Sequence, residues 1–175
     1  MNIQTEEQES NKRELLKYLM DEYGDSVKRL AYSYVKNWDT SEDIAQDVFL
    51  ICYSKLDDFR GDSSYKTWIY RITINKCKDV LKNKWFAKTE FFGFISYFKS
   101  TFSVEEEVLK KSAEIELAES VYSLPLKYRE VIILYYYEQL KIREIHDLTG
   151  LNSETIKSRL KRAKSLLQLK YREVE

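Results

Sequence analysis

The sequence predicts an all-α protein, built as two small helical domains joined by a linker, with a helix-turn-helix in the second domain. Its 175 residues include only 4 glycines and 1 proline, too few for the many turns of a β-protein. Apolar residues recur at helical spacing through most of the chain. At 43% hydrophobic content the chain can bury a core. We place the first domain at residues 12–84, the linker at 85–103 and the second domain at 104–172.

Charge and composition limit the possible functions. Positive and negative residues number 29 each, so the net charge indicates no partner. The placement of the charges does indicate a partner. Basic blocks at residues 66–88 and 157–172 are typical of a protein that presents two faces to a polyanion. With two isolated cysteines and one histidine, we expect no metal site, disulfide framework or cofactor. The chain lacks the roughly 20-residue apolar run of a membrane span and any signal-peptide pattern, which predicts a cytoplasmic protein.

The first domain opens with a polar segment, residues 1 to about 11, which is expected to fray. An apolar stripe then predicts two helical pieces bent near Gly24, because an interior glycine weakens a helix. A turn at 37–41 is expected to lead into a helix over about 41–55, with Thr40 starting a capping box. The residues of this helix expected to face the core are Ile44, Val48, Ile51 and Cys52.

The stretch from Asp57 to Lys84 joins a glycine turn to a basic helix, and it indicates single-stranded DNA binding. Hydroxyl residues after Gly61 can cap the helix. Its apolar face is expected to carry Trp68, Ile69, Ile72, Cys77, Val80 and Leu81, and its cationic face Lys66, Arg71, Lys76, Lys78, Lys82 and Lys84. Cations suit a phosphate backbone, and Tyr65 and Trp68 are placed to stack on an unpaired base. A solvated basic helix with a core tryptophan remains the alternative.

The middle of the chain is the least helix-like part. Residues 85–102 carry eight aromatics around Gly93, and such a segment is an aggregation hazard when exposed. These side chains therefore either fold back on a neighbouring domain or dock into a partner, and both alternatives stay open. An acidic helix is predicted over 104–123, and Pro125 suits the first turn of a helix that runs to about residue 137.

The last part of the chain predicts a helix-turn-helix. A helix over 141–149 stops at Gly150, where a tight turn needs positive φ. Asn152 or Ser153 then caps a final helix that reaches about Tyr171. Its N-terminal half exposes Lys157, Ser158, Arg159, Lys161 and Arg162. Recognition helices place their base readers there, and Arg and Lys donate to guanine or hold phosphates.

Together these motifs resemble the bacterial RNA polymerase sigma factors of the small extracytoplasmic-function branch. The order of the motifs carries the resemblance, which spans roughly residues 14–170: SEDIAQDVF at 41–49, FRGDSSYKTWIYRITINKCKDVL at 59–81, LPLKYREVIIL at 124–134 and EIHDLTGLNSETIKSRLKRAKSLL at 144–167. In the family the first motif grips the clamp coiled coil of RNA polymerase. The second opens and reads the minus-ten promoter element, and the last two belong to the segment that reads the minus-thirty-five element.

The resemblance implies a sigma factor that binds core RNA polymerase, directs it to promoter DNA and helps to open it. The implied polymerase-binding residues are Asp43, Gln46, Asp47 and Phe49. The implied minus-ten residues are Ser63, Ser64 and Tyr65 on a loop that pockets a flipped base, with Trp68, Arg71, Asn75 and Lys76 on the adjoining helix. The minus-thirty-five residues are Lys157, Ser158, Arg159, Lys161 and Arg162. An anti-sigma factor, in the family often in the membrane, is a further implied partner, whereas no small-molecule substrate is implied.

Three residues depart from the pattern of the family. His146 stands where a small residue is preferred, so it either alters the angle between the two helices or tips outward. Glu154 replaces a common glycine and places a carboxylate near the DNA backbone. Lys157 stands where arginine is frequent and lacks the bidentate fork. These departures bear on the promoter sequence and not on the role of the protein.

Two other classes of function compete with this interpretation. A helix-turn-helix regulator that acts without polymerase explains residues 120–171 but leaves the first domain without a role. A protein-only adaptor explains the acidic and aromatic segments and predicts no DNA contact. An enzyme is not expected, because no residue pattern supplies a nucleophile with its base.

Overall fold

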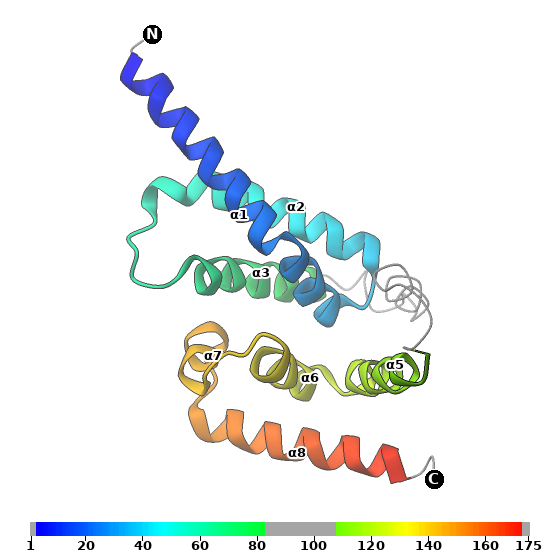
Figure 1. The fold of residues 1–175 in the computed structure, drawn as a ribbon. Helices are drawn as coiled ribbons and strands as arrows, with labels where there is room; N and C mark the ends of the chain where they lie inside the picture. The colour runs from blue at the N-terminus through cyan, green and yellow to red at the C-terminus, as the bar shows by residue number, and fades with distance from the viewer. Residues whose placement is uncertain (1–2, 83–107, 173–175) are drawn as a thin grey trace. The chain divides into compact units, whose positions relative to one another are not determined.

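The computed structural model describes residues 3–82 and 108–172, and every regular element in these two ranges is helical (Figure 1). The chain divides into two compact units, residues 1–89 and 90–175, which we describe separately. The predicted all-α fold with two helical parts is therefore confirmed. The aromatic segment at 85–102 lies outside the described residues.

The first unit is a bundle of three helices. Helix α1 (Ile3–Val35) packs on both α2 (Trp38–Lys55) and α3 (Tyr65–Lys82), and α2 and α3 also contact each other. A single turn of 3₁₀ helix, η1 (Leu56–Asp58), follows α2 and leads into the loop before α3. Fully buried side chains from all three helices form the core, and the largest are Leu19, Val27, Leu30, Ile44, Val48, Ile69, Tyr70 and Ile74.

Helix α1 corrects two expectations, because it begins at Ile3 and runs without a break through Gly24. The N-terminal part that was expected to fray is tied to the rest of the unit, since Lys12 pairs with Asp57 and Tyr53 donates a hydrogen bond to Glu9. The hydrogen bond with Asp57 raises the pKa of Lys12. A single interior glycine costs a helix only about 1 kcal/mol. Apolar residues of α1 on both sides of Gly24, such as Leu19 and Val27, are buried, and their burial outweighs that cost.

Helix α2 begins three residues earlier than predicted, and its cap is Asn37 instead of Thr40. The Asn37 Oδ1 accepts a hydrogen bond from the Thr40 amide at 2.8 Å, and the Ser41 hydroxyl donates to the Asn37 carbonyl. Trp38, the first helical residue, packs its ring against Tyr32 with 5.6 Å between centroids. Asn is a better N-cap than Thr, and the packed tryptophan favours the earlier start.

Helix α3 is capped as predicted by a hydroxyl residue, since the Ser64 Oγ accepts from the Thr67 amide at 3.2 Å. Its buried face is rotated from the predicted one and consists of Thr67, Ile69, Tyr70, Thr73, Ile74 and Cys77. Leu81 is 37% exposed and Trp68 only half-buried. The threonines explain the difference. The Thr73 hydroxyl donates to the Ile69 carbonyl at 2.9 Å, so a residue counted as polar enters the core without an unsatisfied group.

The second unit places shorter helices around the last helix. Helix α5 (Val108–Ser123) and α6 (Leu126–Ile132) both contact α8 (Ser153–Arg172), which α7 (Ile142–Thr149) also contacts. Pro125 stands at the N-cap position, one residue before the helix it was predicted to open. The helix predicted to reach residue 137 changes type at η3 (Ile133–Tyr137), a π-helical segment in which the Glu138 amide donates to the Ile133 carbonyl at 3.0 Å. Hydrophobic periodicity does not reveal such a bulge.

Both cysteines lie in the core of the first unit, on the helix faces where the sequence places them, and both are free thiols. Burial raises the pKa of Cys52 and of Cys77 to about 12, so both stay protonated at neutral pH. Within residues 3–82 and 108–172, no helix has the length and apolarity that a membrane crossing requires.

The cap of α2 leads to a first prediction. Asn37→Ala should lower the free energy of unfolding of the first unit by about 0.5–2 kcal/mol, because the Thr40 amide loses its acceptor. Asn37→Asp restores the acceptor and should be nearly neutral. Urea unfolding followed by tryptophan fluorescence checks this, since all three tryptophans lie in residues 1–89. A larger loss for Thr40→Ala than for Asn37→Ala would show that the cap is elsewhere.

Candidate functional site

The outer face of α2 combines acidic, amide and apolar side chains. Asp43, Gln46, Asp47 and Leu50 follow helical spacing i, i+3, i+4 and i+7, so they line one face. Asp43 and Gln46 are exposed, and Leu50, at 68%, has the largest exposed fraction among the exposed large apolar side chains of the described residues. Phe49, which the resemblance placed among the polymerase-binding residues, is only 6% exposed. Leu50 was missed, although the inward positions Ile44, Val48 and Cys52 imply that residue 50 points outward.

Three aromatic side chains meet where the loop enters α3. The ring of Phe59 stacks on that of Tyr65, with 4.6 Å between centroids and 27° between planes, and lies 5.1 Å from the ring of Trp68. All three are half-buried, so each keeps part of its surface in contact with solvent. Gly61 supplies the positive φ of 76° that turns the loop. We call Phe59, Tyr65 and Trp68 the aromatic corner.

The polar residues around the aromatic corner differ in their exposure and in the contacts they already make within the chain. Ser63 is half-buried, and the hydroxyl of the exposed Ser64 is engaged in capping α3. Arg71 and Asn75, which follow Trp68 by about one and two turns of α3, are exposed. Lys76 is turned toward α2, where its Nζ lies 2.7 Å from the Asp47 carboxylate. One ion pair thus joins a residue of the predicted polymerase-binding set to a residue of the predicted minus-ten set.

The predicted helix-turn-helix is present in the second unit. Gly150 ends α7 in the left-handed conformation with φ of 75°, and Asn152 caps α8 by accepting from the Thr155 amide at 2.7 Å. Ile145 and Ile156 are both fully buried between the two helices. His146 is exposed, and its Nδ1 lies 2.7 Å from the Leu151 carbonyl oxygen. Of the two outcomes expected for His146, the imidazole tips outward.

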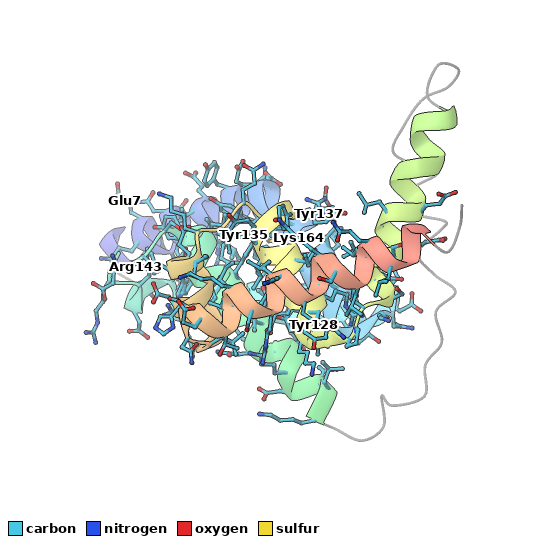
Figure 2. All side chains as sticks on the ribbon, turned by 90° about the horizontal axis from the view of Figure 1, so that it is seen from below. Glu7, Tyr128, Tyr135, Tyr137, Arg143 and Lys164 are labelled. Carbon is cyan, nitrogen blue, oxygen red and sulfur yellow. The ribbon has the colours of Figure 1, made fainter. Side chains whose placement is uncertain are left out.

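The basic residues of α8 do not all face solvent. Lys157, Ser158, Lys161 and Arg162 are exposed, whereas the Arg159 side chain is 25% exposed and lies 3.8 Å from the buried Glu130 of α6. The Lys157 ammonium lies 2.8 Å from the Glu154 carboxylate. Two of the residues that differ from the family pattern therefore neutralise each other's charge. Lys164 lies beside the tyrosines of η3 (Figure 2), with its Nζ 5.1 Å from the centre of the Tyr136 ring. A hydrogen bond with Tyr136 raises the pKa of Lys164.

The fold is that of an all-helical protein whose second unit carries a helix-turn-helix, a common DNA-binding motif. The family signature Sigma-70 region 2 matches residues 19–87, and Sigma-70, region 4 matches residues 115–167. The chain belongs to the bacterial RNA polymerase sigma factors, in their extracytoplasmic-function branch.

Curated relatives align over most of both chains. RNA polymerase sigma factor SigV of Bacillus subtilis is 34% identical over 144 residues, 81% of each chain. ECF RNA polymerase sigma factor SigW of the same organism is 29% identical over 165 residues, 89% of this chain and 88% of SigW. Their match covers both helical units.

Two solved structures share the fold. CnrH in complex with the cytosolic domain of CnrY gives a TM-score of 0.68 at 22% identity and covers 95% of this chain and 94% of that chain. The sigma factor RpoE in complex with the anti-sigma factor NepR from Bartonella quintana gives a TM-score of 0.65 at 20% identity. The match covers 87% of this chain and 93% of that chain.

The ion pair between α2 and α3 leads to a second prediction. Asp47→Ala, Lys76→Ala and the double variant should give a coupling free energy of about 0.2–1 kcal/mol, because both side chains are partly exposed. Urea unfolding at low salt measures it, and 1 M salt should reduce it. Asp43→Ala in place of Asp47→Ala is the matched control. Equal coupling for Asp43 and Asp47 would contradict the contact.

Proposed function

We propose that this sigma factor divides its task among three surfaces: the outer face of α2 for core RNA polymerase, the aromatic corner for the minus-ten element and the outer face of α8 for the minus-thirty-five element. The observation that carries the proposal is the aromatic corner beside the exposed Arg71 and Asn75 of α3. A corner of this kind holds an unpaired base while the neighbouring cation holds its backbone.

The polymerase surface consists of Asp43, Gln46 and Asp47, to which we add Leu50. Interfaces depend on a few apolar or aromatic anchors surrounded by polar contacts. Leu50 is 68% exposed between such polar neighbours, which supports this role. Phe49, buried at 6% exposure, packs beneath this face and supports it.

The minus-ten surface comprises the loop residues Ser63 and Ser64 with the α3 residues Tyr65, Trp68, Arg71, Asn75 and Lys76. Unstacking a base costs a few kcal/mol, and stacking on an aromatic ring returns about 1–3 kcal/mol. Phosphate contacts offset the remainder. Ser64 serves this surface mainly by holding the start of α3, since its Oγ accepts from the Thr67 amide. The surface captures a base and carries out no reaction on it, so we propose that the protein is not an enzyme.

The minus-thirty-five surface comprises Lys157, Ser158, Lys161 and Arg162, with Arg159 acting indirectly. The 3.8 Å contact of Arg159 with Glu130 supports a role in orienting α8 on α6. Arg162 is the strongest candidate for base readout, because a guanidinium donates two parallel hydrogen bonds to the O6 and N7 of guanine. Lys157 shares its charge with Glu154, which favours a weaker phosphate contact.

An anti-sigma factor is the proposed regulator. RpoE and CnrH, which share this fold, are each described in complex with a second protein, NepR in one case and the cytosolic domain of CnrY in the other. We propose that such a partner, in the membrane or free, masks the polymerase surface. We also propose a cytoplasmic location and the domain boundaries 12–84, 85–103 and 104–172, with the aromatic segment as the linker.

The test of this function is reconstitution. The full chain is mixed with bacterial core RNA polymerase, passed over a sizing column, and assayed for transcripts from a library of promoter fragments. Co-elution together with transcripts from a defined subset supports the proposal. DNA binding without co-elution would favour the regulator that acts without polymerase, and neither activity would favour the adaptor.

A third prediction concerns opening of the promoter. Tyr65→Ala should reduce strand separation by about 5- to 150-fold, the equivalent of the 1–3 kcal/mol of one stacked base. Permanganate footprinting of the polymerase complex measures it, and Tyr65→Phe, which keeps the ring, is the control. Because Tyr65 is half-exposed, co-elution with polymerase should be unchanged. Normal footprints for Tyr65→Ala would place the base pocket elsewhere.

A fourth prediction separates base readout from phosphate contact on α8. Arg162→Ala should cost about 1–3 kcal/mol and relax preference at a single upstream promoter position. Lys164→Ala should leave the positional preference intact, since the Lys164 ammonium is engaged with Tyr136. Binding to promoter variants over a range of salt concentrations checks both. A uniform loss for Arg162→Ala across all promoters would show that Arg162 only holds a phosphate.

A further inference from the structure

One ion pair joins α2 and α3 of the first unit across the contact between the two helices. The Lys76 Nζ lies 2.7 Å from the Asp47 carboxylate, and the two side chains are 33% and 48% exposed. The pair between Lys82 and Asp79, within α3, is longer at 3.3 Å, and its side chains are 77% and 69% exposed. Less contact with water means less screening, so the pair between the helices is the stronger of the two.

Core packing fixes where both residues of this pair lie. Val48, which follows Asp47, is fully buried, and so is Cys77, which follows Lys76. Because neighbours on a helix keep a fixed angular relation, burial of Val48 and Cys77 sets Asp47 and Lys76 at the edge of the contact between the helices. The short Asp47 side chain therefore presents its carboxylate to Lys76 before any ligand binds.

Lys76 stands at the boundary between the outer and the packed face of α3. Its neighbour Asn75 is exposed, whereas Cys77 is fully buried. A lysine carries its charge on a long flexible stem, so the ammonium can turn to either side. Toward α2 it meets the Asp47 carboxylate, and away from α2 it reaches the solvent beside Asn75. A carboxylate and a DNA phosphate both present anionic oxygens, so the two compete for one cation.

We propose that Asp47 is a positioning residue of the minus-ten surface: in the free protein its carboxylate holds the Lys76 ammonium against α2, and a DNA phosphate has to displace it. The inference rests on the proposed function, which assigns Lys76 to the minus-ten surface. It gives Asp47 a second role besides its place on the polymerase surface. Because an ion pair between partly exposed side chains is weak, the competition lowers the affinity for DNA by about 1.5- to 5-fold and does not prevent binding.

Asp47→Asn tests the proposal, because it removes the charge and keeps the shape of the side chain. Full-length protein without polymerase is titrated at low salt into a fluorescently labelled single-stranded DNA of mixed sequence, about 12 nucleotides long. Asp47→Asn should bind about 1.5- to 5-fold more tightly than wild type. The slope of log affinity against log salt should steepen by about 0.7, the value for one more phosphate contact on a single strand. Glu42→Gln, which removes an exposed carboxylate from the same helix, is the matched control and should bind as wild type does.

Lys76→Ala decides whether the gain passes through the ion pair. In a Lys76→Ala background, Asp47→Asn should no longer raise the affinity, whereas a merely structural effect of Asp47 would be the same in both backgrounds. Unchanged affinity for Asp47→Asn, or a gain that persists without Lys76, overturns the proposal.

The outcome is separate from the test of the proposed function. Failure of wild-type protein to co-elute with core polymerase would remove that function and leave these comparisons of the free protein valid. Thermal unfolding followed by circular dichroism checks that each variant folds. If Asp47→Asn does not fold, Asp47→Ser takes its place, and unchanged affinity for that variant likewise overturns the proposal.

Discussion

The first unit depends on how α3 is rotated against the other two helices. Tyr70 is fully buried, and Ile69, Thr73 and Ile74 join it in the core. Because side chains of a helix keep a fixed angular relation to one another, burying this set turns Arg71 and Asn75 toward solvent and leaves Trp68 half-buried. The aromatic corner and the cation beside it are therefore a consequence of core packing. A different rotation of α3 would remove Trp68 from its contact with Phe59 and so dissolve the aromatic corner.

In the second unit, buried charged residues fix how the helices are oriented against one another. Arg129 is 4% exposed and donates to the carbonyls of Tyr122 and Leu124 at 2.7 and 3.0 Å, which satisfies acceptors at the C-terminal end of α5. Its neighbour Glu130 reaches Arg159 of α8. A buried charge is costly unless it is paired, so these contacts specify one arrangement of α5, α6 and α8. One basic residue of α8, Arg159, thus helps to orient the helix that carries the proposed DNA-facing residues.

The ion pair between Asp47 and Lys76 connects two surfaces for which we propose different partners. Asp47 belongs to the proposed polymerase face and Lys76 to the proposed minus-ten face, and in the free protein each neutralises the other at 2.7 Å. A partner that engages either residue changes the charge available to the other. The ion pair therefore gives the two proposed surfaces a direct electrostatic connection.

Sequence by itself determined the helical class, the helix-turn-helix, the hydroxyl cap of α3 and the family, because these depend on local spacing, capping chemistry and motif order. It also determined most of the residues that lie on the outer faces of α2 and α8. Only the tertiary structure decided that Phe49 is buried and Leu50 exposed, and that Arg159 turns toward Glu130. The same holds for the continuous α1 and the π-helical turn. These features arise from contacts between helices. The order of residues along one helix does not specify which neighbouring helix will pack against each of its faces.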